Sequence, residues 1–371
     1  MDKVKKMLLV HIPTGRCNFK CPYCFITLNK AWEGDRDELN RTEDEIRKAF
    51  DMKRFGGPCY VNLCASGETL IYPQVVGFLK AILENGHYVE LVTNGSLTQR
   101  FQEISKFPKE LLERLSFKFS LQYTELLRLG LMDTFFENVN LMRSSGASIN
   151  VELTPVDEEE QYIDEIKKIC KEKVGAWCHI TIARDDRDEK IPVLSEHTLD
   201  EYYNIWSTFD SNMIDFKKSV FQQYRNEFCY AGAWSLYINL FTGDMRQCYQ
   251  KPVCGNIYDY NRPIPEKPVG KCHLSHCYNA HMLMTLGLLP DADTPTYTQI
   301  RNRVCEDGSE WLQPKVKSFF NSKLSESNEL YSEEEKKKYI KEAKSFIRRR
   351  KIKKIIKRPI TKISGIINKE K

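Results

Sequence analysis

Three cysteines, Cys17, Cys21 and Cys24, lie within eight residues near the start of the chain. Their spacing lets a single loop direct three thiolates at one metal centre. A four-iron cubane cluster normally takes four cysteine ligands, so three would leave one iron open for another molecule. A structural zinc site is closed by four ligands, usually from paired CxxC units, and no fourth ligand is adjacent here. The loop therefore favours an iron–sulfur cluster, with zinc as the weaker interpretation.

A second pair of cysteines, Cys229 and Cys248, brackets the segment WSLYINLFTGDMRQ. Two short alternating stretches around Thr242-Gly243-Asp244 predict a β-hairpin. Because a hairpin folds its ends toward each other, these two thiols are expected at one metal centre. Five other cysteines are interpreted as small buried hydrophobic residues: Cys59, Cys64, Cys170, Cys178 and Cys305.

Short apolar runs alternate with helical patterns through the first half of the chain, which predicts a parallel sheet built from βα units. The six expected strands are 7–12, 60–64, 88–93, 116–122, 148–154 and 179–183. Thr42 and Glu45 predict a capping box, Pro73 and Asn85-Gly86 predict the ends of another helix, and residues 198–221 predict a further one. In a barrel of this kind the working groups lie at the carboxyl ends of the strands. The three-cysteine loop follows the first strand directly.

The composition narrows the class of protein. At 371 residues the chain suits a barrel-sized core with an appendage. The longest apolar run near the start, residues 7–10, is too short for a signal peptide or a membrane span. Thirteen cysteines in a cytoplasmic setting favour metal or redox chemistry over disulfides. The expected location is the cytoplasm.

The CxxxCxxC spacing, with the aromatic Tyr23 before its last cysteine, resembles that of the radical S-adenosylmethionine (radical SAM) enzymes. The resemblance implies an α/β fold, a partial (β/α)6 TIM-like barrel, and extends over roughly residues 6–183. It also implies a [4Fe-4S] cluster on Cys17, Cys21 and Cys24, whose open iron binds S-adenosylmethionine. Electron transfer into the sulfonium would release a 5′-deoxyadenosyl radical, so the cofactor supplies the difficult chemistry and the protein supplies position.

Further polar residues fall where this family contacts its cofactor, at the ends of later strands. Gly67 and Glu68 keep part of the family's Gly-Gly-Glu-Pro turn, whereas Ser66 and Thr69 depart from it. Side chains two apart on a strand share a face, which brings Ser120 and Gln122 to the same side. For each single residue a hydrogen-bonded strand end is the alternative. The implied cofactor contacts are Tyr23, Ser66, Gly67, Glu68, Thr69, Asn94, Ser120, Gln122 and Glu152, the last also a candidate substrate contact.

The order Cys229, Gly243, Cys248 also resembles the start of the SPASM and twitch extensions of radical SAM enzymes, which hold auxiliary iron–sulfur clusters. The resemblance implies one auxiliary [4Fe-4S] cluster, with Cys272 and Cys277 as its remaining ligands. A zinc-bound knuckle is the alternative. Three other residues are rivals as ligands: His273, His276 and Cys254, the last of which we expect to be a buried thiol.

We expect a radical SAM partial barrel over residues 1–222, a small twitch-like cluster domain over 223–290 and a helical region with a basic tail over 291–371. From Lys344 to Lys371 there are twelve Lys or Arg residues and one acidic residue, Glu370. The rest of the chain is slightly acidic, so no nucleic-acid partner is expected. Isoleucines at helical spacing in the tail predict either peripheral contact with the inner face of a membrane or a solvated or packed helix, which Pro359 would kink or divide.

These features predict an enzyme that reductively cleaves S-adenosylmethionine and modifies its substrate by radical chemistry. A cluster with four protein ligands suits electron transfer, so the modification is expected to be oxidative. The expected substrate is a small carbohydrate-like metabolite or a peptide, and the expected electron donor is a flavodoxin or ferredoxin. The alternative function is a zinc-stabilised binding protein without turnover.

Overall fold

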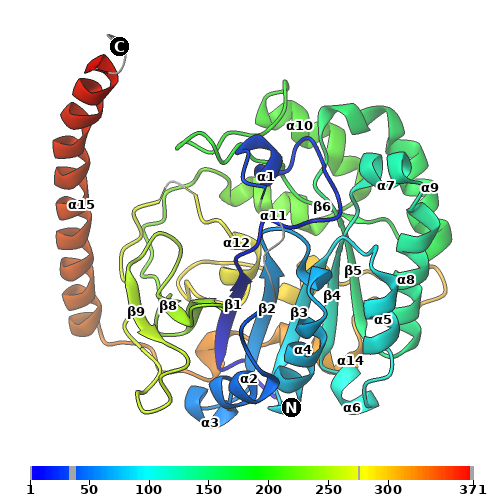
Figure 1. Ribbon diagram of the computed structural model, residues 1–371, viewed down its shortest axis with the longest axis horizontal. Coiled ribbons are helices and arrows are strands. Elements are labelled where there is room, and N and C mark those ends of the chain that lie inside the picture. Colours follow the sequence, from blue (N-terminus) through cyan, green and yellow to red (C-terminus); the bar gives the residue numbers. More distant parts are fainter. Residues whose placement is uncertain (1, 33–38, 275, 368–371) are drawn as a thin grey trace.

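The computed structural model describes residues 2–32, 39–274 and 276–367, with residues 351–367 described by backbone alone. Its centre is a sheet in the order β6-β5-β4-β3-β2-β1-β7-β8-β9 (Figure 1). The pairs from β6 to β7 along this order are all parallel, whereas the β7–β8 and β8–β9 pairs are antiparallel. The strands are β1 (Lys6–Ile12), β2 (Cys59–Ala65), β3 (Tyr88–Thr93), β4 (Leu115–Ser120), β5 (Ser148–Leu153), β6 (His179–Ile180), β7 (Ser235–Asn239), β8 (Asp244–Arg246) and β9 (Val253–Asn256).

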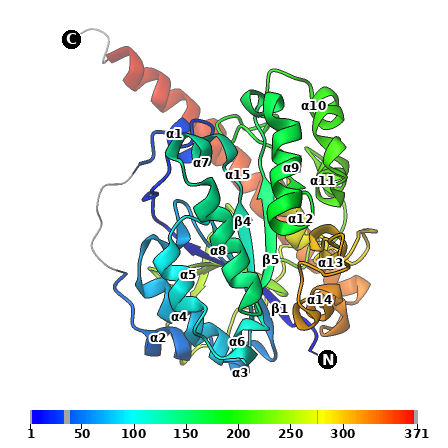
Figure 2. The same ribbon diagram turned by 90° about the vertical axis from the view of Figure 1, so that its right-hand side faces the viewer.

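Helices follow most of these strands and cover the sheet, as Figure 2 shows for α4, α5 and α8. The longer helices are α2 (Glu43–Ala49), α4 (Gln74–Glu84), α5 (Thr98–Ile104), α7 (Tyr123–Leu129), α8 (Met132–Ser144), α9 (Ile163–Val174), α10 (Leu199–Trp206), α11 (Asn212–Val220), α14 (Pro314–Asn321) and α15 (Glu333–Ile367). The shorter ones are α1 (Phe25–Leu28), α3 (Met52–Phe55), α6 (Lys109–Leu112), α12 (Ala280–Leu283) and α13 (Tyr297–Arg301), with 3-10 turns η1 (Thr69–Ile71), η2 (Asp157–Tyr162), η3 (Ser207–Phe209) and η4 (Leu324–Glu326).

The first six strands agree with the prediction of a parallel α/β sheet, although β6 is shorter than expected. The capping box of Thr42 and Glu45 is present, and α4 ends at Asn85 before Gly86 in the left-handed region. The prediction of a single helix over 198–221 is wrong. The first helix ends at Trp206 and continues as the 3-10 turn η3. At Asp210 the backbone then enters the left-handed region, with φ at 49°, before a separate α11 begins.

The predicted hairpin is present as β7 and β8, but it does not stand apart from the barrel sheet. β7 pairs in parallel with β1, with Leu8 opposite Leu236 and Val10 opposite Ile238. These four side chains are all buried in one hydrophobic core. The sheet therefore continues across the boundary expected at residue 222.

A charged side chain from the C-terminal region is buried against the central sheet. Arg301 of α13 is fully buried, and its Nη1 lies 2.5 Å from Glu152 Oε2 on β5 and 3.0 Å from Asn150 Oδ1. The hydroxyl of Tyr297 donates to the Glu90 carboxylate on β3 at 2.9 Å. A buried carboxylate is tolerated only when it is paired. The chain after residue 290 therefore completes the interior of the domain.

The last helix, α15, lies on the side of the molecule that carries β8 and β9 (Figure 1). Glu342 forms an ion pair with Lys267, and Arg350 donates to His273 Nε2 and to the carbonyl of Gln250. α15 is one element through Pro359, without the division expected there. The isoleucines of the tail lie outside the described side chains, so membrane contact stays a prediction. Among the described residues, no helix is long and apolar enough to cross a membrane.

Candidate active site

The three-cysteine loop lies at the carboxyl end of β1 and is fastened on both sides. The Cys21 thiol is buried, and those of Cys17 and Cys24 are half-buried. The backbone N–H of Lys20 donates to the Glu125 carboxylate of α7 at 2.8 Å, and the Thr27 hydroxyl donates to the Cys21 carbonyl at 2.9 Å. Cys24 also forms the N-terminal cap position of α1. The helix that follows and the carboxylate together fix the loop.

The turn after β2 lies directly against this loop. The N–H groups of Ser66, Gly67 and Glu68 donate in succession to the carbonyls of residues 12, 14 and 16, at 3.2, 2.7 and 2.9 Å. A Cβ added to Gly67 would lie only 1.8 Å from the Arg16 carbonyl oxygen. Only glycine allows the two backbones to approach this closely. The retained Gly67 therefore joins the turn to the cysteine loop.

Glu68 links the same turn to the end of β3. Its buried carboxylate accepts hydrogen bonds from the Thr93 hydroxyl at 2.7 Å, the Asn94 N–H at 2.8 Å and the Leu70 N–H at 2.9 Å. Burial raises the pKa of Glu68, and these donors oppose that rise. The side chain thus braces two strand ends against each other.

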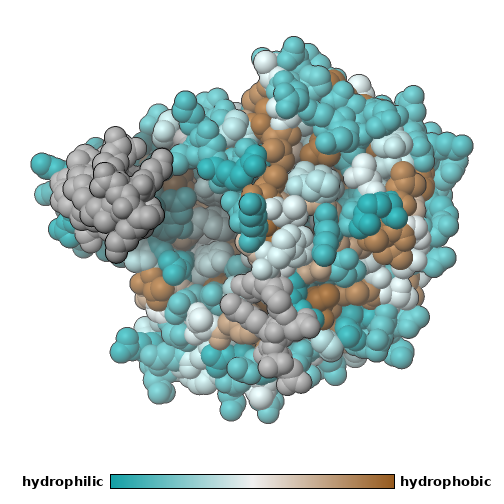
Figure 3. Space-filling model, turned by 45° about the horizontal axis from the view of Figure 1, so that its top comes forward, coloured by the Kyte–Doolittle hydropathy of each residue, from teal (hydrophilic) through white to brown (hydrophobic). Residues whose placement is uncertain are grey.

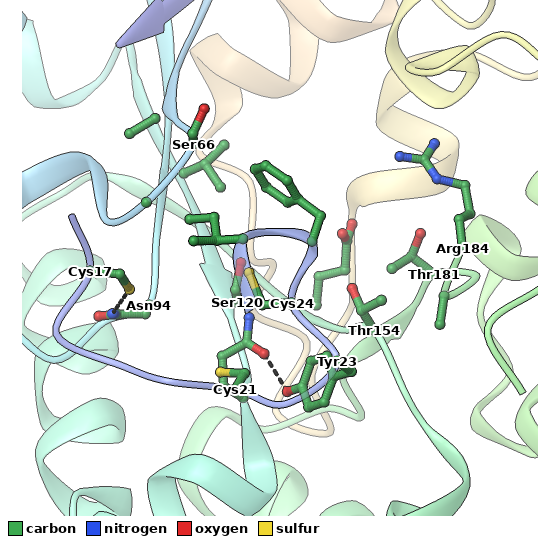
Figure 4. Close-up of a pocket in the computed structure, with 18 of the residues that line it drawn as sticks. Cys17, Cys21, Tyr23, Cys24, Ser66, Asn94, Ser120, Thr154, Thr181 and Arg184 are labelled. Carbon is green, nitrogen blue, oxygen red and sulfur yellow. Dashed lines mark hydrogen bonds between the residues drawn. The ribbon is translucent and has the colours of Figure 1, made fainter. Parts of the chain in front are cut away.

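Asn94 and Tyr23 connect the loop to further strand ends (Figure 4). Asn94 Nδ2 donates to Asn18 Oδ1 at 2.9 Å and lies 3.8 Å from the Cys17 sulfur. The Tyr23 hydroxyl donates to the Gln122 side-chain carbonyl, which follows β4. Residues from three separate strand ends therefore meet around the thiols.

These residues line one pocket of about 320 Å³. Seen with the strand ends turned forward, this side of the molecule carries a brown apolar band flanked by teal polar residues (Figure 3). All twelve residues that the sequence predicted for the cluster and the cofactor line this pocket: Cys17, Cys21, Tyr23, Cys24, Ser66, Gly67, Glu68, Thr69, Asn94, Ser120, Gln122 and Glu152.

Glu152 is the one predicted residue already paired with cations. Its carboxylate lies 2.5 Å from Lys118 Nζ and 2.5 Å from Arg301 Nη1. Burial by itself would raise the pKa of Glu152, but the two cations reverse this and hold the pKa well below its usual range. Glu152 is therefore an anion that organises neighbouring basic groups.

The pocket has further polar lining residues that sequence reasoning missed. Lys118 lies on the same face of β4 as Ser120, so the alternation of FKFSLQ was a usable signal. Lys217 comes from α11, and no sequence pattern marked it. The other missed polar or charged lining residues are Thr181, Arg184, Tyr278, Asn279 and His281.

The cysteine thiols must lose their protons before they can hold a metal. Burial raises the pKa of Cys17 to about 11 and that of Cys21 to about 12, so a metal must displace their protons. Tetrahedral zinc, with Zn–S bonds of about 2.3 Å, would hold its sulfurs about 3.8 Å apart. Among the described residues, only Asp157, Glu160 and His197 bring three ligand atoms within 4.8 Å of one another. Within the ranges that the structure describes, neither cysteine group brings three sulfurs within that distance of one another.

The second cysteine group lines a separate, mostly apolar cavity. Its walls include Cys229, Cys248, Cys272 and Cys277, together with His273 and His276. Burial and the neighbouring thiols raise the pKa of Cys229, and burial raises that of Cys248 to about 12. His276 Nε2 faces Arg184 at 3.2 Å, and His273 Nε2 faces Arg350 at 3.1 Å.

The prediction that Cys254 is a buried thiol is wrong. Cys254 is exposed, because it lies on β9, the edge strand of the sheet. It does not line the cavity of the second cysteine group. Of the five cysteines expected to be buried, Cys64 is half-buried and the other four are buried.

Residues 11–122 match the family model of the Radical SAM superfamily. The matched segment includes the three-cysteine loop, the turn at 66–69, Asn94 and Gln122. This segment, under a third of the chain, is similar to the radical SAM domain. Such a domain implies a [4Fe-4S] cluster and S-adenosylmethionine, and it supports a role as an enzyme. The match ends before Glu152 and before the second cysteine group. No curated protein sequence matches this chain.

Solved structures of radical SAM enzymes are similar to this chain at low identity. Streptococcus suis SuiB bound to S-adenosylmethionine has a TM-score of 0.47 and 15% identity, covering 71% of this chain and 67% of that one. Native anSMEcpe with bound AdoMet has a TM-score of 0.45 and 14% identity, covering 68% and 78%. BtrN in complex with AdoMet and 2-DOIA has a TM-score of 0.36 and 15% identity, covering 69% and 80%. The similarity to the radical SAM superfamily therefore rests on the family match over residues 11–122.

Proposed function

We propose that the radical SAM domain reductively cleaves S-adenosylmethionine and uses the resulting radical to modify a substrate oxidatively. The observation that carries this proposal is the single pocket of about 320 Å³ lined by Cys17, Cys21 and Cys24 together with the turn at 66–69. When bound there, the cluster and S-adenosylmethionine supply a 5′-deoxyadenosyl radical. The chain contributes ligands, orientation and a partly enclosed pocket.

The roles of individual residues in this proposal follow from their contacts. The three thiolates hold the cluster, and Gly67 sets the distance between their loop and the cofactor turn. Glu68 keeps that turn against Asn94 through a 2.8 Å hydrogen bond. Ser120 and Gln122 offer polar groups on the wall beside the loop.

We further propose one auxiliary [4Fe-4S] cluster, held by Cys229, Cys248, Cys272 and Cys277 in a twitch-like extension. These thiols share one cavity, and Cys277 is followed at once by Tyr278 and Asn279, which line the main pocket. A cluster with four protein ligands has no open iron, so electron transfer suits it better than substrate binding. Its closeness to the main pocket supports a role in accepting an electron from an oxidised substrate radical.

The proposed substrate is a small carbohydrate-like metabolite or a peptide, and the proposed electron donor is a flavodoxin or ferredoxin. Neither class of substrate is excluded by the pocket, which is open at the strand ends. Contact of the basic tail with a membrane surface remains a separate proposal. It rests on the sequence of residues 344–371 alone.

Metal content tests the proposal directly. Iron, sulfide and zinc per chain are measured in protein prepared without oxygen, for wild type and for a Cys17→Ala, Cys21→Ala, Cys24→Ala variant. We expect about eight irons in wild type and about four in the variant. Wild type given dithionite and S-adenosylmethionine should also form 5′-deoxyadenosine.

A Cys229→Ala, Cys248→Ala variant should likewise fall to about four irons but keep the loop cluster. Cys254→Ala is the matched control, because this exposed thiol does not line the second cavity, and its iron content should equal that of wild type. Zinc with little iron in wild type would overturn the radical proposal and favour a zinc-stabilised binding protein.

A further inference from the structure

Several polar groups on one wall of the main pocket lack hydrogen-bond partners among the described residues. We call Thr181, Arg184, Lys217 and His281 the basic wall; they come from β6 and its following loop, α11 and α12. His281 is only 3% exposed, yet neither of its ring nitrogens has a hydrogen-bond partner. The hydroxyl of Thr181, a 4% exposed residue, also lacks one. Buried polar groups normally have hydrogen-bond partners, so these atoms are candidates to bind a ligand.

Lys217 adds an unpaired charge to this wall. Its ammonium has no hydrogen bond or ion pair with any described residue, and it faces the pocket. Burial lowers the pKa of Lys217 well below its usual range. The Glu152 carboxylate opposes this, and the nearby cations Arg184, Lys118 and Arg301 lower the pKa further. Holding an ammonium among cations is unfavourable unless an anion joins them.

The carboxylates near the basic wall are already committed. Glu152 is shared between Lys118 and Arg301, each at 2.5 Å. Asp186 lies 3.7 Å from Arg184 Nε. The cations Lys118, Arg184, Lys217 and Arg301 therefore outnumber the carboxylates of Glu152 and Asp186 around this part of the pocket.

We propose that the basic wall binds an anionic group of the substrate, a carboxylate or a phosphate. Such a group accepts hydrogen bonds from the Lys217 ammonium, the His281 N–H and the Thr181 hydroxyl, and it supplies the missing negative charge. The inference rests on the proposed function and narrows its substrate class to molecules that carry an acid group.

The carboxylate of S-adenosylmethionine is not the expected ligand of this wall. Figure 4 places Thr181 and Arg184 on the opposite side of the pocket from Cys17 and Asn94. In the family that the loop resembles, the cofactor's carboxylate binds the open iron, which belongs at the cysteine end. The basic wall is therefore available to a second molecule.

The test is isothermal titration calorimetry on the full chain, cluster-loaded, without oxygen and saturated with S-adenosylmethionine. Inorganic phosphate and succinate are the two probes, and binding of either supports the proposal while identifying the favoured acid group. Lys217→Met should weaken that binding at least tenfold. Lys218→Met is the matched control on the same helix, because Lys218 pairs with Asp200 at 2.9 Å and does not line the pocket. It should change binding less than twofold.

Several outcomes overturn the inference. If wild type forms 5′-deoxyadenosine but binds neither probe, the anion site is refuted and the proposed function stays intact. If the probes bind only when S-adenosylmethionine is left out, the basic wall binds the cofactor. If Lys217→Met and Lys218→Met weaken probe binding equally, the binding is nonspecific electrostatic attraction. If Lys217→Met does not fold by thermal melting, His281→Gln replaces it, with an expected loss of at least threefold. Absence of iron and of 5′-deoxyadenosine would instead refute the proposed function.

Discussion

Gly67→Ala is expected to displace the cysteine loop without altering any ligand. The added Cβ would lie 1.8 Å from the Arg16 carbonyl oxygen and 2.6 Å from its carbon, whereas ordinary contact begins at 3.4 Å. One backbone must therefore move by about 1.6 Å, the difference between 3.4 and 1.8 Å. Neither side can rotate away, because the Gly67 N–H is bonded to the Thr14 carbonyl at 2.7 Å.

This displacement acts on the residue next to Cys17. Misplacing reacting groups by about 1 Å costs on the order of 100-fold in rate. We therefore expect 5′-deoxyadenosine formation to fall about 100-fold, with reduced iron per chain. Both quantities are measured on protein reconstituted without oxygen and supplied with dithionite and S-adenosylmethionine.

Gly77→Ala is the matched control for this prediction. Its added Cβ would also meet a close atom, Glu43 Oε1 at 2.0 Å, but that atom ends a flexible, exposed side chain that can turn into solvent. Alanine in the interior of α4 should also stabilise the helix by about 1 kcal/mol. A Gly67→Ala protein with the iron content and rate of wild type would refute the close-approach argument, as would equal damage in Gly77→Ala.

Two further predictions concern buried charges. Arg301→Met removes the guanidinium that lies beside the Glu152 and Glu90 carboxylates. It should lower the free energy of unfolding, measured by chemical denaturation, by about 3–5 kcal/mol. A loss below about 1 kcal/mol would show that these carboxylates do not depend on Arg301. Burial raises the pKa of Glu159 to about 7 from the ordinary 4.5, so the folded chain keeps a proton that the unfolded chain releases. The contribution of Glu159 to the free energy of unfolding is therefore fully present below pH 4.5. It is lost as the pH rises through 7, a change of about 3 kcal/mol. Glu159→Gln should flatten that loss in denaturation curves recorded from pH 4.5 to 8, and an unchanged pH profile would count against the assignment.

The sequence was sufficient for features that depend on neighbouring residues. The spacing of Cys17, Cys21 and Cys24 predicted one loop with three converging thiols, and that loop lines one pocket. Alternation along β4 predicted that Ser120 would face inward. Local hydrogen-bonding chemistry likewise predicted the capping box at Thr42. Each of these depends on contacts over a few residues, which a sequence records directly.

Local pattern failed where long-range packing decided the outcome. Cys254 resembles a buried thiol in sequence, but β9 has a neighbour on one side only, and the residue is exposed. The hairpin at β7 was predictable, whereas its parallel pairing with β1 was not, because no short-range signal records which strand lies beside it. The helix expected over 198–221 ends early, at Trp206, before a left-handed Asp210.

The sequence by itself predicted which residues gather at the cysteine end of the pocket, since ligand type, spacing and strand-end turns are local properties. Only the tertiary structure decided the opposite wall. Lys217 and His281 lie 64 positions apart on α11 and α12, and they face one pocket because those helices pack together beneath β6. Which face of a helix turns inward depends on all of its neighbours at once. The unpaired charge in this pocket is therefore a property of the folded chain.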